Sequence, residues 1–312
     1  MKYYLLIILH CFLFADYSGG YPGASFNYGT NAREIALSKS TISTYNSGFN
    51  AFVNPALLPE IKNNEYGFSY FVMSLDRSIQ SISISRPLPP SAGVGLSFFR
   101  AGTNNIIETD VFGTEVGTLS HYEGYGMLSF GIDLGSLSGG FNIKAFFNDL
   151  AEYSGTGIGF DIGFLYDKEN FNVALKINNI SSSYSWDKGG SAQYEENIPT
   201  QYMIGFTLER IKNLTLSTQL NLIPIILDEF TKKEELYKKI HIGAEYRLIH
   251  NDIPIFIRMG LKEINNDINY SVGFGLPVKI SKKITLNCDY ALDPGLMNQG
   301  ISQLFSITLV NY

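Results

Sequence analysis

The chain is poor in cysteine, with two among its 312 residues. Cys11 lies in the apolar N-terminal stretch described below, so only Cys288 remains once that stretch is removed. A single cysteine cannot form an internal disulfide, so the fold is expected to need no covalent cross-link. A structural zinc site needs several Cys and His ligands at short spacing. With one mature cysteine and no histidine pair, we expect no metal site.

The chain also lacks a long apolar run. The stretch from Tyr3 to Phe14 follows the basic Lys2 and ends at the small residue Ala15. This pattern is typical of a secretory signal peptide, so we assign residues 1–15 to one, with cleavage near Ala15. The stretch is shorter than the ~20 apolar residues of a membrane-spanning helix, and no later segment comes close. These lengths exclude a helical membrane protein.

Charge and histidine are scarce as well. Charged residues make up 17% of the chain and the net charge is -6, which argues against nucleic acid as a partner because its binders display basic stripes. The mature chain has three histidines, His121, His241 and His250, and none lies in a recognisable catalytic motif. The glycine clusters precede no helix, so they do not fit a nucleotide-binding loop. We expect no enzyme activity, no catalytic residues and no cofactor.

Aromatic residues and glycine are plentiful, with 20 Tyr, 22 Phe and 30 Gly. From about residue 64 onward, large apolar residues alternate with small or polar ones. In residues 157–166, one face carries Ile158, Phe160, Ile162, Phe164 and Tyr166, and the other carries Gly157, Gly159, Asp161 and Gly163. Strict alternation over about ten residues indicates a transmembrane strand with one face toward lipid and one toward a polar interior.

Fourteen segments show this alternation. They lie near residues 65–74, 77–87, 92–103, 121–134, 137–149, 157–167, 170–180, 200–210, 213–224, 237–249, 254–263, 268–279, 282–291 and 300–311. The number is even, as in single-chain bacterial barrels. We therefore predict an all-β fold, a 14-stranded antiparallel transmembrane β-barrel over residues 64–312, surrounded by the lipid of the outer membrane of a Gram-negative-type bacterium. A soluble β-sandwich is disfavoured because the charges fall on the glycine-rich face.

The connectors between these strands alternate in length. Those after even-numbered strands are short, whereas the long ones, residues 104–120, 181–199, 224–236 and 292–299, all follow odd-numbered strands. Outer-membrane barrels pair short periplasmic turns with longer external loops, so both ends of the barrel chain are expected on the periplasmic side. In the third long connector, Thr231 precedes Glu234 by three residues, a spacing that predicts a short surface helix.

Residues 16–63, between the signal peptide and the barrel, do not alternate. Residues 31–39 are compatible with a short helix, and residues 49–59 are rich in Phe, Leu and Asn. Apolar side chains at this density must be covered by other protein atoms, and the barrel lumen is the nearest place that offers cover.

Two runs in this segment carry a family resemblance. Residues 31–37 (NAREIAL) and 49–58 (FNAFVNPALL) resemble the N-terminal segment of FadL-type barrels, especially the PorV/PorQ branch, and residues 107–118 are similar to the first long loop of that branch. The resemblance implies a 14-stranded barrel in which residues 16–63 form a plug or hatch. The plug residues expected from it are Phe49, Phe52, Asn54, Pro55, Ala56 and Leu57.

The resemblance leaves two functions open, because fold alone does not decide function. FadL-type barrels carry hydrophobic small molecules across the outer membrane. PorV/PorQ-type barrels are accessory components of type IX secretion that engage exported cargo domains and partner subunits. We favour the second function for this chain, acting by binding in protein secretion or surface attachment, with passive transport of a hydrophobic small molecule as the alternative.

The inward-facing charges bear on this choice. If the strand phases are right, the lumen contains Asp133, Lys144, Asp161, Lys176, Glu209, Glu245, Arg247, Arg258 and Asp289, together with His241 and Lys262. Both signs are present, which indicates a mutually neutralised lumen that hydrogen-bonds the plug; a polar permeation path is the alternative interpretation. A charged lumen suits a fatty acid less well than an apolar lumen does.

The external loops are the candidate partner surface. Residues 181–199 contain Tyr184, Trp186 and Tyr194 among small polar residues, and exposed Trp and Tyr are favoured binding anchors. Aromatic residues near a barrel rim also anchor the lipid interface, so both interpretations stay open. The charged run at residues 228–239 is either a second docking surface or a solvated face.

Overall fold

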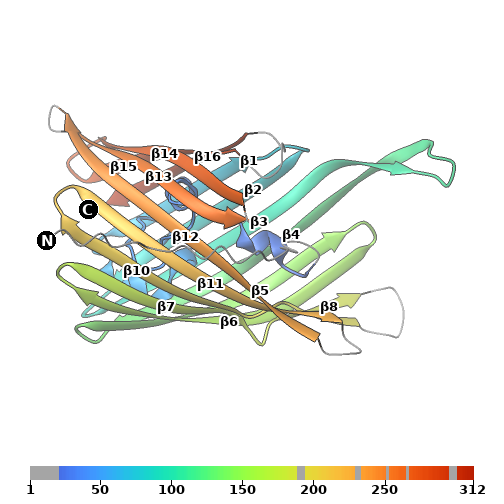
Figure 1. The fold of residues 1–312 in the computed structure, drawn as a ribbon, viewed down its shortest axis with the longest axis horizontal. Coiled ribbons are helices and arrows are strands. Elements are labelled where there is room, and N and C mark those ends of the chain that lie inside the picture. The colour runs from blue at the N-terminus through green and yellow to red at the C-terminus, as the bar shows by residue number, and fades with distance from the viewer. Residues whose placement is uncertain (1–20, 188–193, 229–232, 251–252, 265–266, 295–300) are drawn as a thin grey trace, which may run out of the picture.

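The alternation of the sequence produces one closed antiparallel sheet. The computed structural model describes residues 21–187, 194–228, 233–250, 253–264, 267–294 and 301–312, so the expected signal peptide lies outside the described residues. Within these ranges, fourteen strands pair in chain order, and the pairing of β1 with β16 closes the sheet into a barrel (Figure 1). The predicted 14-stranded barrel is confirmed.

The barrel strands agree with the fourteen predicted segments, apart from extensions at their ends. They are β1 (Asn64–Val72), β2 (Arg77–Leu88), β3 (Ala92–Thr109), β4 (Glu115–Asp133), β5 (Leu137–Leu150), β6 (Tyr153–Lys168), β7 (Phe171–Ile180), β10 (Gln201–Ile211), β11 (Leu214–Asp228), β12 (Lys233–His250), β13 (Ile253–Ile264), β14 (Asp267–Lys279), β15 (Ile284–Asp293) and β16 (Ser302–Asn311). Two further strands, β8 (Ser183–Asp187) and β9 (Tyr194–Asn197), form a hairpin that pairs with β6.

The two faces of the sheet differ as the pattern predicts. On β6, Ile158, Phe160 and Ile162 point outward and are exposed, whereas Asp161 points inward and is fully buried. An apolar outer wall around a polar inner wall is the arrangement of a transmembrane barrel. Within the described ranges, no helix is both long and apolar enough to cross a membrane.

Two of the predicted long loops are instead continuations of strands. The hairpin of β3 and β4 extends through most of residues 104–120, and β11 and β12 extend to Asp228 and from Lys233. The prediction of a helix at Glu234 is wrong, because β12 begins at Lys233 and includes Glu234. Thr231, the other residue of the predicted capping pair, lies outside the described residues. In both hairpins the strands keep pairing with each other beyond the barrel, which satisfies their backbone hydrogen bonds.

The N-terminal segment, residues 21–63, packs against the inner wall (Figure 1). It contains η1 (Ala24–Asn27), α1 (Ala32–Ala36), α2 (Asn50–Val53) and η2 (Pro55–Glu60). Local caps explain the two runs noted in the sequence. The side chain of Asn31 caps α1 by accepting from Glu34 N, and Asn54 caps η2 by accepting from Ala56 N, with Pro55 at the first helical position.

Small inward-facing residues allow this close packing. Hydroxyl pairs join the segment to the wall, with Oγ–Oγ distances of 2.8 Å for Ser38–Ser271 and for Ser40–Ser217. The wall glycines contact backbone directly: a Cβ added at Gly140 would lie 2.5 Å from the carbonyl carbon of Pro55. A larger residue at such a position would push η2 away from the sheet.

Neighbouring glycines on β5 provide a test. Gly139 faces outward, where an added Cβ would meet nothing closer than the Phe164 ring at 3.9 Å. We expect Gly140→Val to lower the free energy of unfolding in detergent micelles by about 1–3 kcal/mol through overpacking, and Gly139→Val to change it little. Urea titration followed by the fluorescence of the single Trp186 measures both. Equal losses in the two variants would contradict the packing of η2 on β5.

Candidate functional site

The expected plug residues are all buried in the barrel interior. Phe49, Phe52, Asn54, Pro55, Ala56 and Leu57 are covered by the inner wall and by the rest of the N-terminal segment. Asn54 also donates from Nδ2 to the carbonyl oxygen of Ile42, at 3.0 Å, and so ties η2 to the preceding part of the segment. The side chain that caps η2 therefore also holds η2 to the preceding part of the segment.

An aromatic cluster joins this segment to strands β3, β4 and β5. The Phe26 ring stacks on Phe146 at 5.5 Å between centroids and meets Tyr125 edge-on at 5.1 Å. The centroid of the Phe52 ring lies 6.3 Å from that of Tyr125, and the Phe26 ring meets Phe99 of β3 edge-on at 6.0 Å. One half of the interior is therefore packed with apolar side chains, as in a soluble protein core.

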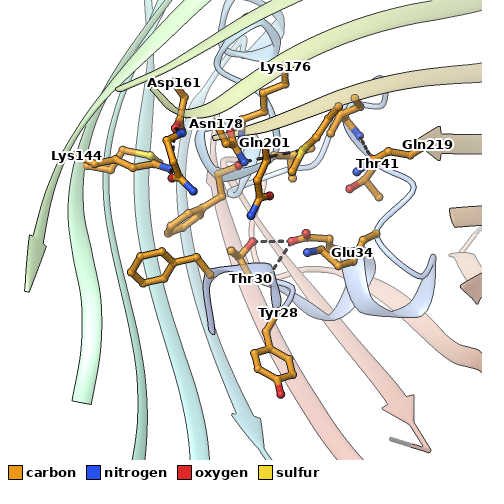
Figure 2. Close-up of a pocket in the computed structure, with 18 of the residues that line it drawn as sticks. Tyr28, Thr30, Glu34, Thr41, Lys144, Asp161, Lys176, Asn178, Gln201 and Gln219 are labelled. Atoms are coloured by element: carbon orange, nitrogen blue, oxygen red, sulfur yellow. Dashed lines mark hydrogen bonds and ion pairs between the residues drawn. The ribbon is translucent and has the colours of Figure 1, made fainter. Parts of the chain in front are cut away.

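A buried ionic cluster lies beside these rings. Lys144 Nζ is 2.8 Å from Asp161 Oδ1, and Lys176 Nζ donates to the carbonyl oxygen of Phe52 at 2.6 Å. Asp161 also accepts from Asn142 Nδ2 at 2.8 Å and from Asn179 N at 3.0 Å. Figure 2 shows the three charged side chains converging from neighbouring strands. Lys176 and Asn142 hydrogen-bond the cluster to the carbonyl oxygens of Phe52 and Ala51 in the N-terminal segment.

A second ionic network connects the segment to the opposite wall. Arg33 of α1 forms two hydrogen bonds with Glu245, at 2.9 and 3.0 Å. Arg258 bridges Glu245 and Asp289, and Lys262 pairs with Asp293. Arg33 and Asp293 were missed by sequence reasoning. Arg33 lies outside the alternating strands, so the alternation could not indicate which way its side chain faces. Asp293 lies just beyond the predicted end of its strand.

Three of the predicted lumen charges lie nearer the end of the barrel that bears the short turns. Asp133, Glu209 and Arg247 are exposed there. Burial raises the pKa of Glu60, at the end of η2, to about 7, and the nearby carboxylates of Asp167, Glu209 and Asp133 add to the rise. The sequence analysis did not identify Glu60, because no sequence pattern places it next to strand ends far along the chain.

The described part of the chain encloses a small cavity in the centre of the interior. A cavity of about 40 Å³ lies between the ionic cluster and the segment, bordered by Glu34, Lys144, Asp161 and Gln219 (Figure 2). This volume suits one or two water molecules. A larger cavity of about 790 Å³ opens at the end with the short turns, between Arg247, Phe256 and Pro277, and is bounded by the network of Arg33, Glu245 and Arg258.

Of the three aromatic residues expected to be exposed in the predicted partner loop, two are buried. Tyr184 is 0% exposed and Trp186 is 9% exposed, whereas Tyr194 is 45% exposed. The hairpin of β8 and β9 folds onto β6, where Gly155 leaves a flat surface for the Trp186 ring. Trp186 Nε1 donates to Glu196 Oε2 at 3.0 Å, and Tyr184 contacts Phe146. The fold buries Tyr184 and Trp186, so Tyr194 is the one residue of the three whose ring is exposed.

The ionic cluster gives a second prediction. Asp161→Asn would leave Lys144 and Lys176 buried close together without a carboxylate, so we expect a loss of about 3–5 kcal/mol in the free energy of unfolding. The exposed Asp149 on the adjacent strand is the matched control, and Asp149→Asn should change stability by less than about 0.5 kcal/mol. Urea titration in micelles distinguishes the two, and an unchanged Asp161→Asn midpoint would show that the cluster is not needed.

Comparison with solved structures places the fold among known transport barrels. CymD, described as a monoaromatic hydrocarbon channel, matches with a TM-score of 0.65 and 10% identity, covering 91% of this chain and 97% of CymD. The toluene transporter TbuX of Ralstonia pickettii matches with a TM-score of 0.62 and 11% identity over 90% of this chain and 97% of TbuX. The toluene transporter TodX of P. putida matches with a TM-score of 0.63 and 12% identity, covering 91% of this chain and 99% of TodX. At these identities the likeness establishes the fold alone.

Sequence comparison identifies the family. No curated protein matches the chain. The model of the family described as type IX secretion system membrane protein PorP/SprF matches residues 36–308, which is most of the chain. The match supports the expected link to type IX secretion, but it names PorP/SprF where we had expected PorV/PorQ. The chain therefore belongs to the PorP/SprF family of type IX secretion system membrane proteins and is a β-barrel of the outer membrane.

Proposed function

We propose that this protein is a non-catalytic accessory barrel of type IX secretion or surface attachment that works by binding exported cargo domains or partner subunits. The observation that carries the proposal is the filled interior. Among the described residues, a central cavity has a volume of about 40 Å³. The Arg33–Glu245 ion pair ties the N-terminal segment to one wall, and the hydrogen bond from Lys176 to the carbonyl oxygen of Phe52 ties it to the other. A barrel filled in this way is suited to holding partners at its ends and rim while it keeps the membrane closed.

The alternative, passive transport of a hydrophobic small molecule, has less support. The structural relatives include channels and transporters for such compounds, but the likeness extends to the fold alone. An apolar molecule that crossed the barrel along its axis would meet the buried charged residues Lys144, Asp161 and Lys176, and such contacts are unfavourable. A route from a pocket at the hatch through a lateral opening would avoid them. The 790 Å³ cavity also ends at a charged network.

The proposed role gives residues 16–63 the function of a plug. Removing residues 21–63 should leave a barrel that still inserts, as judged by its heat-modifiable mobility in electrophoresis, and that conducts ions in planar bilayers. The polar inner wall, no longer covered, would then line a water-filled path. The intact chain, reconstituted in parallel, should be silent. A truncated barrel that inserts but conducts no ions would contradict the plug.

The function itself is tested by what stays bound to the protein. Native outer membranes are solubilised gently, the barrel is isolated through an affinity tag, and its companions are identified by mass spectrometry, with an untagged strain as the control. We expect exported proteins that share a C-terminal domain, or other secretion subunits. Recovery of the barrel alone, with a stoichiometric fatty acid or other apolar compound, would favour the transporter instead.

A further inference from the structure

The hairpin of β3 and β4 continues well beyond the barrel. The last pairing of β3 with β2 is Thr103 with Arg77, and the last pairing of β4 with β5 is His121 with Leu150. Residues 104–120 are here called the external arm. Its strand pairings, from Ile106–Leu119 to Thr109–Glu115, are with each other, and at its base Asn104 and Asn105 hydrogen-bond to Asp76. At about 3.3 Å per residue, the arm reaches roughly 20 Å past the sheet. Figure 1 shows it projecting farther than the neighbouring hairpins at that end.

The outward face of the barrel shows where the membrane ends below the arm. The Arg100 guanidinium lies 3.9 Å from the centroid of the Tyr122 ring and donates to Gln80 Oε1 at 3.1 Å. A cation, an amide and a tyrosine together on the outer wall are typical of the headgroup level. The arm begins beyond this level, with Tyr122 Oη donating to Asn104 Oδ1 at 2.6 Å at its base. Hydrocarbon therefore does not explain the apolar residues of the arm.

The tip of the arm presents two apolar side chains to solvent. Val111 is 93% exposed and Phe112 is 89% exposed. The turn that holds them is ordered by Asp110, whose Oδ1 accepts from Phe112 N at 2.8 Å and from Thr114 N at 2.9 Å. Gly113 provides the positive φ of 81° that the turn needs. A pre-ordered turn with an exposed aromatic ring has the properties of a binding anchor.

The charge of the arm selects the kind of partner. Residues 104–120 contain Glu108, Asp110 and Glu115 and no Lys, Arg or His. The phosphates of a lipid surface repel three carboxylates, which opposes insertion of the tip into a membrane. A protein pocket with an apolar floor and a rim of Lys or Arg side chains complements both the ring and the carboxylates.

We propose that the external arm is a docking finger whose tip residues, Val111 and Phe112, insert into a basic-rimmed apolar pocket on an exported protein at the cell surface. This inference rests on the proposed function, since it names the element of the barrel that holds the exported partner. The arm thereby takes the role that the sequence had suggested for Tyr184 and Trp186, which the fold buries.

Photo-crosslinking in intact cells tests the contact. p-Benzoylphenylalanine is placed at position 112, and at position 134 as the matched control, because Leu134 is 68% exposed at the end with the short turns. We expect a protein adduct of discrete mass at position 112 that is absent at position 134 and that falls at least tenfold with Val111→Ser or in high salt. An adduct with lipid, or the same pattern at both positions, would overturn the proposal.

An assay of surface display tests the role of the arm and the proposed secretion function independently. Exported proteins at the surface are quantified by their sensitivity to added protease in strains that carry the V111S/F112S variant, the Leu134→Ser control, or a deletion of the whole protein. We expect the deletion and V111S/F112S to lower display at least tenfold at unchanged barrel levels, and Leu134→Ser to leave it intact. If only the deletion lowers display, the arm proposal fails and the function stands. If the deletion has no effect, the proposed function fails as well, and with it the exported partner.

Discussion

The structure depends on how the inside of a 14-stranded barrel is filled. Closing fourteen strands satisfies the edge hydrogen bonds of the sheet, but it encloses a lumen wider than wall side chains alone fill. In this chain the filling is the N-terminal segment, residues 21–63. Its entry requires inward glycines and serines, because at Gly93 and Gly140 an added Cβ would collide with η2. The glycine content of the strands therefore follows from the packing of the segment.

Filling the lumen also determines its electrostatics. Charges inside a barrel lose much of their hydration, so they persist where partners and hydrogen bonds replace the water. Asp161 meets this requirement through Lys144, Asn142 and Asn179, and Glu245 through two arginines. Because Arg33 comes from the N-terminal segment, one network ties the segment and the wall into a single unit.

The two ends of the barrel differ in the surfaces they present. The end with short turns has a cavity of about 790 Å³ walled by both apolar and charged residues, and the other end bears the hairpins of β3 with β4 and of β8 with β9. These hairpins behave differently. The second lies down on β6 and buries its aromatics, whereas the first stands away from the sheet and exposes Val111 and Phe112.

The sequence by itself determined the barrel, because a period of two over ten residues has one physical solution when one face is apolar and the other is not. The number of strands, the inward phase of Lys144, Asp161 and Arg258, and the need to cover residues 49–59 followed from that local pattern. Tertiary structure alone decided which inward charges meet, that Arg33 joins them, and that Trp186 folds inward while Phe112 does not. These outcomes depend on contacts between residues distant in the chain, and on whether a glycine such as Gly155 leaves space for a ring, which no local period encodes.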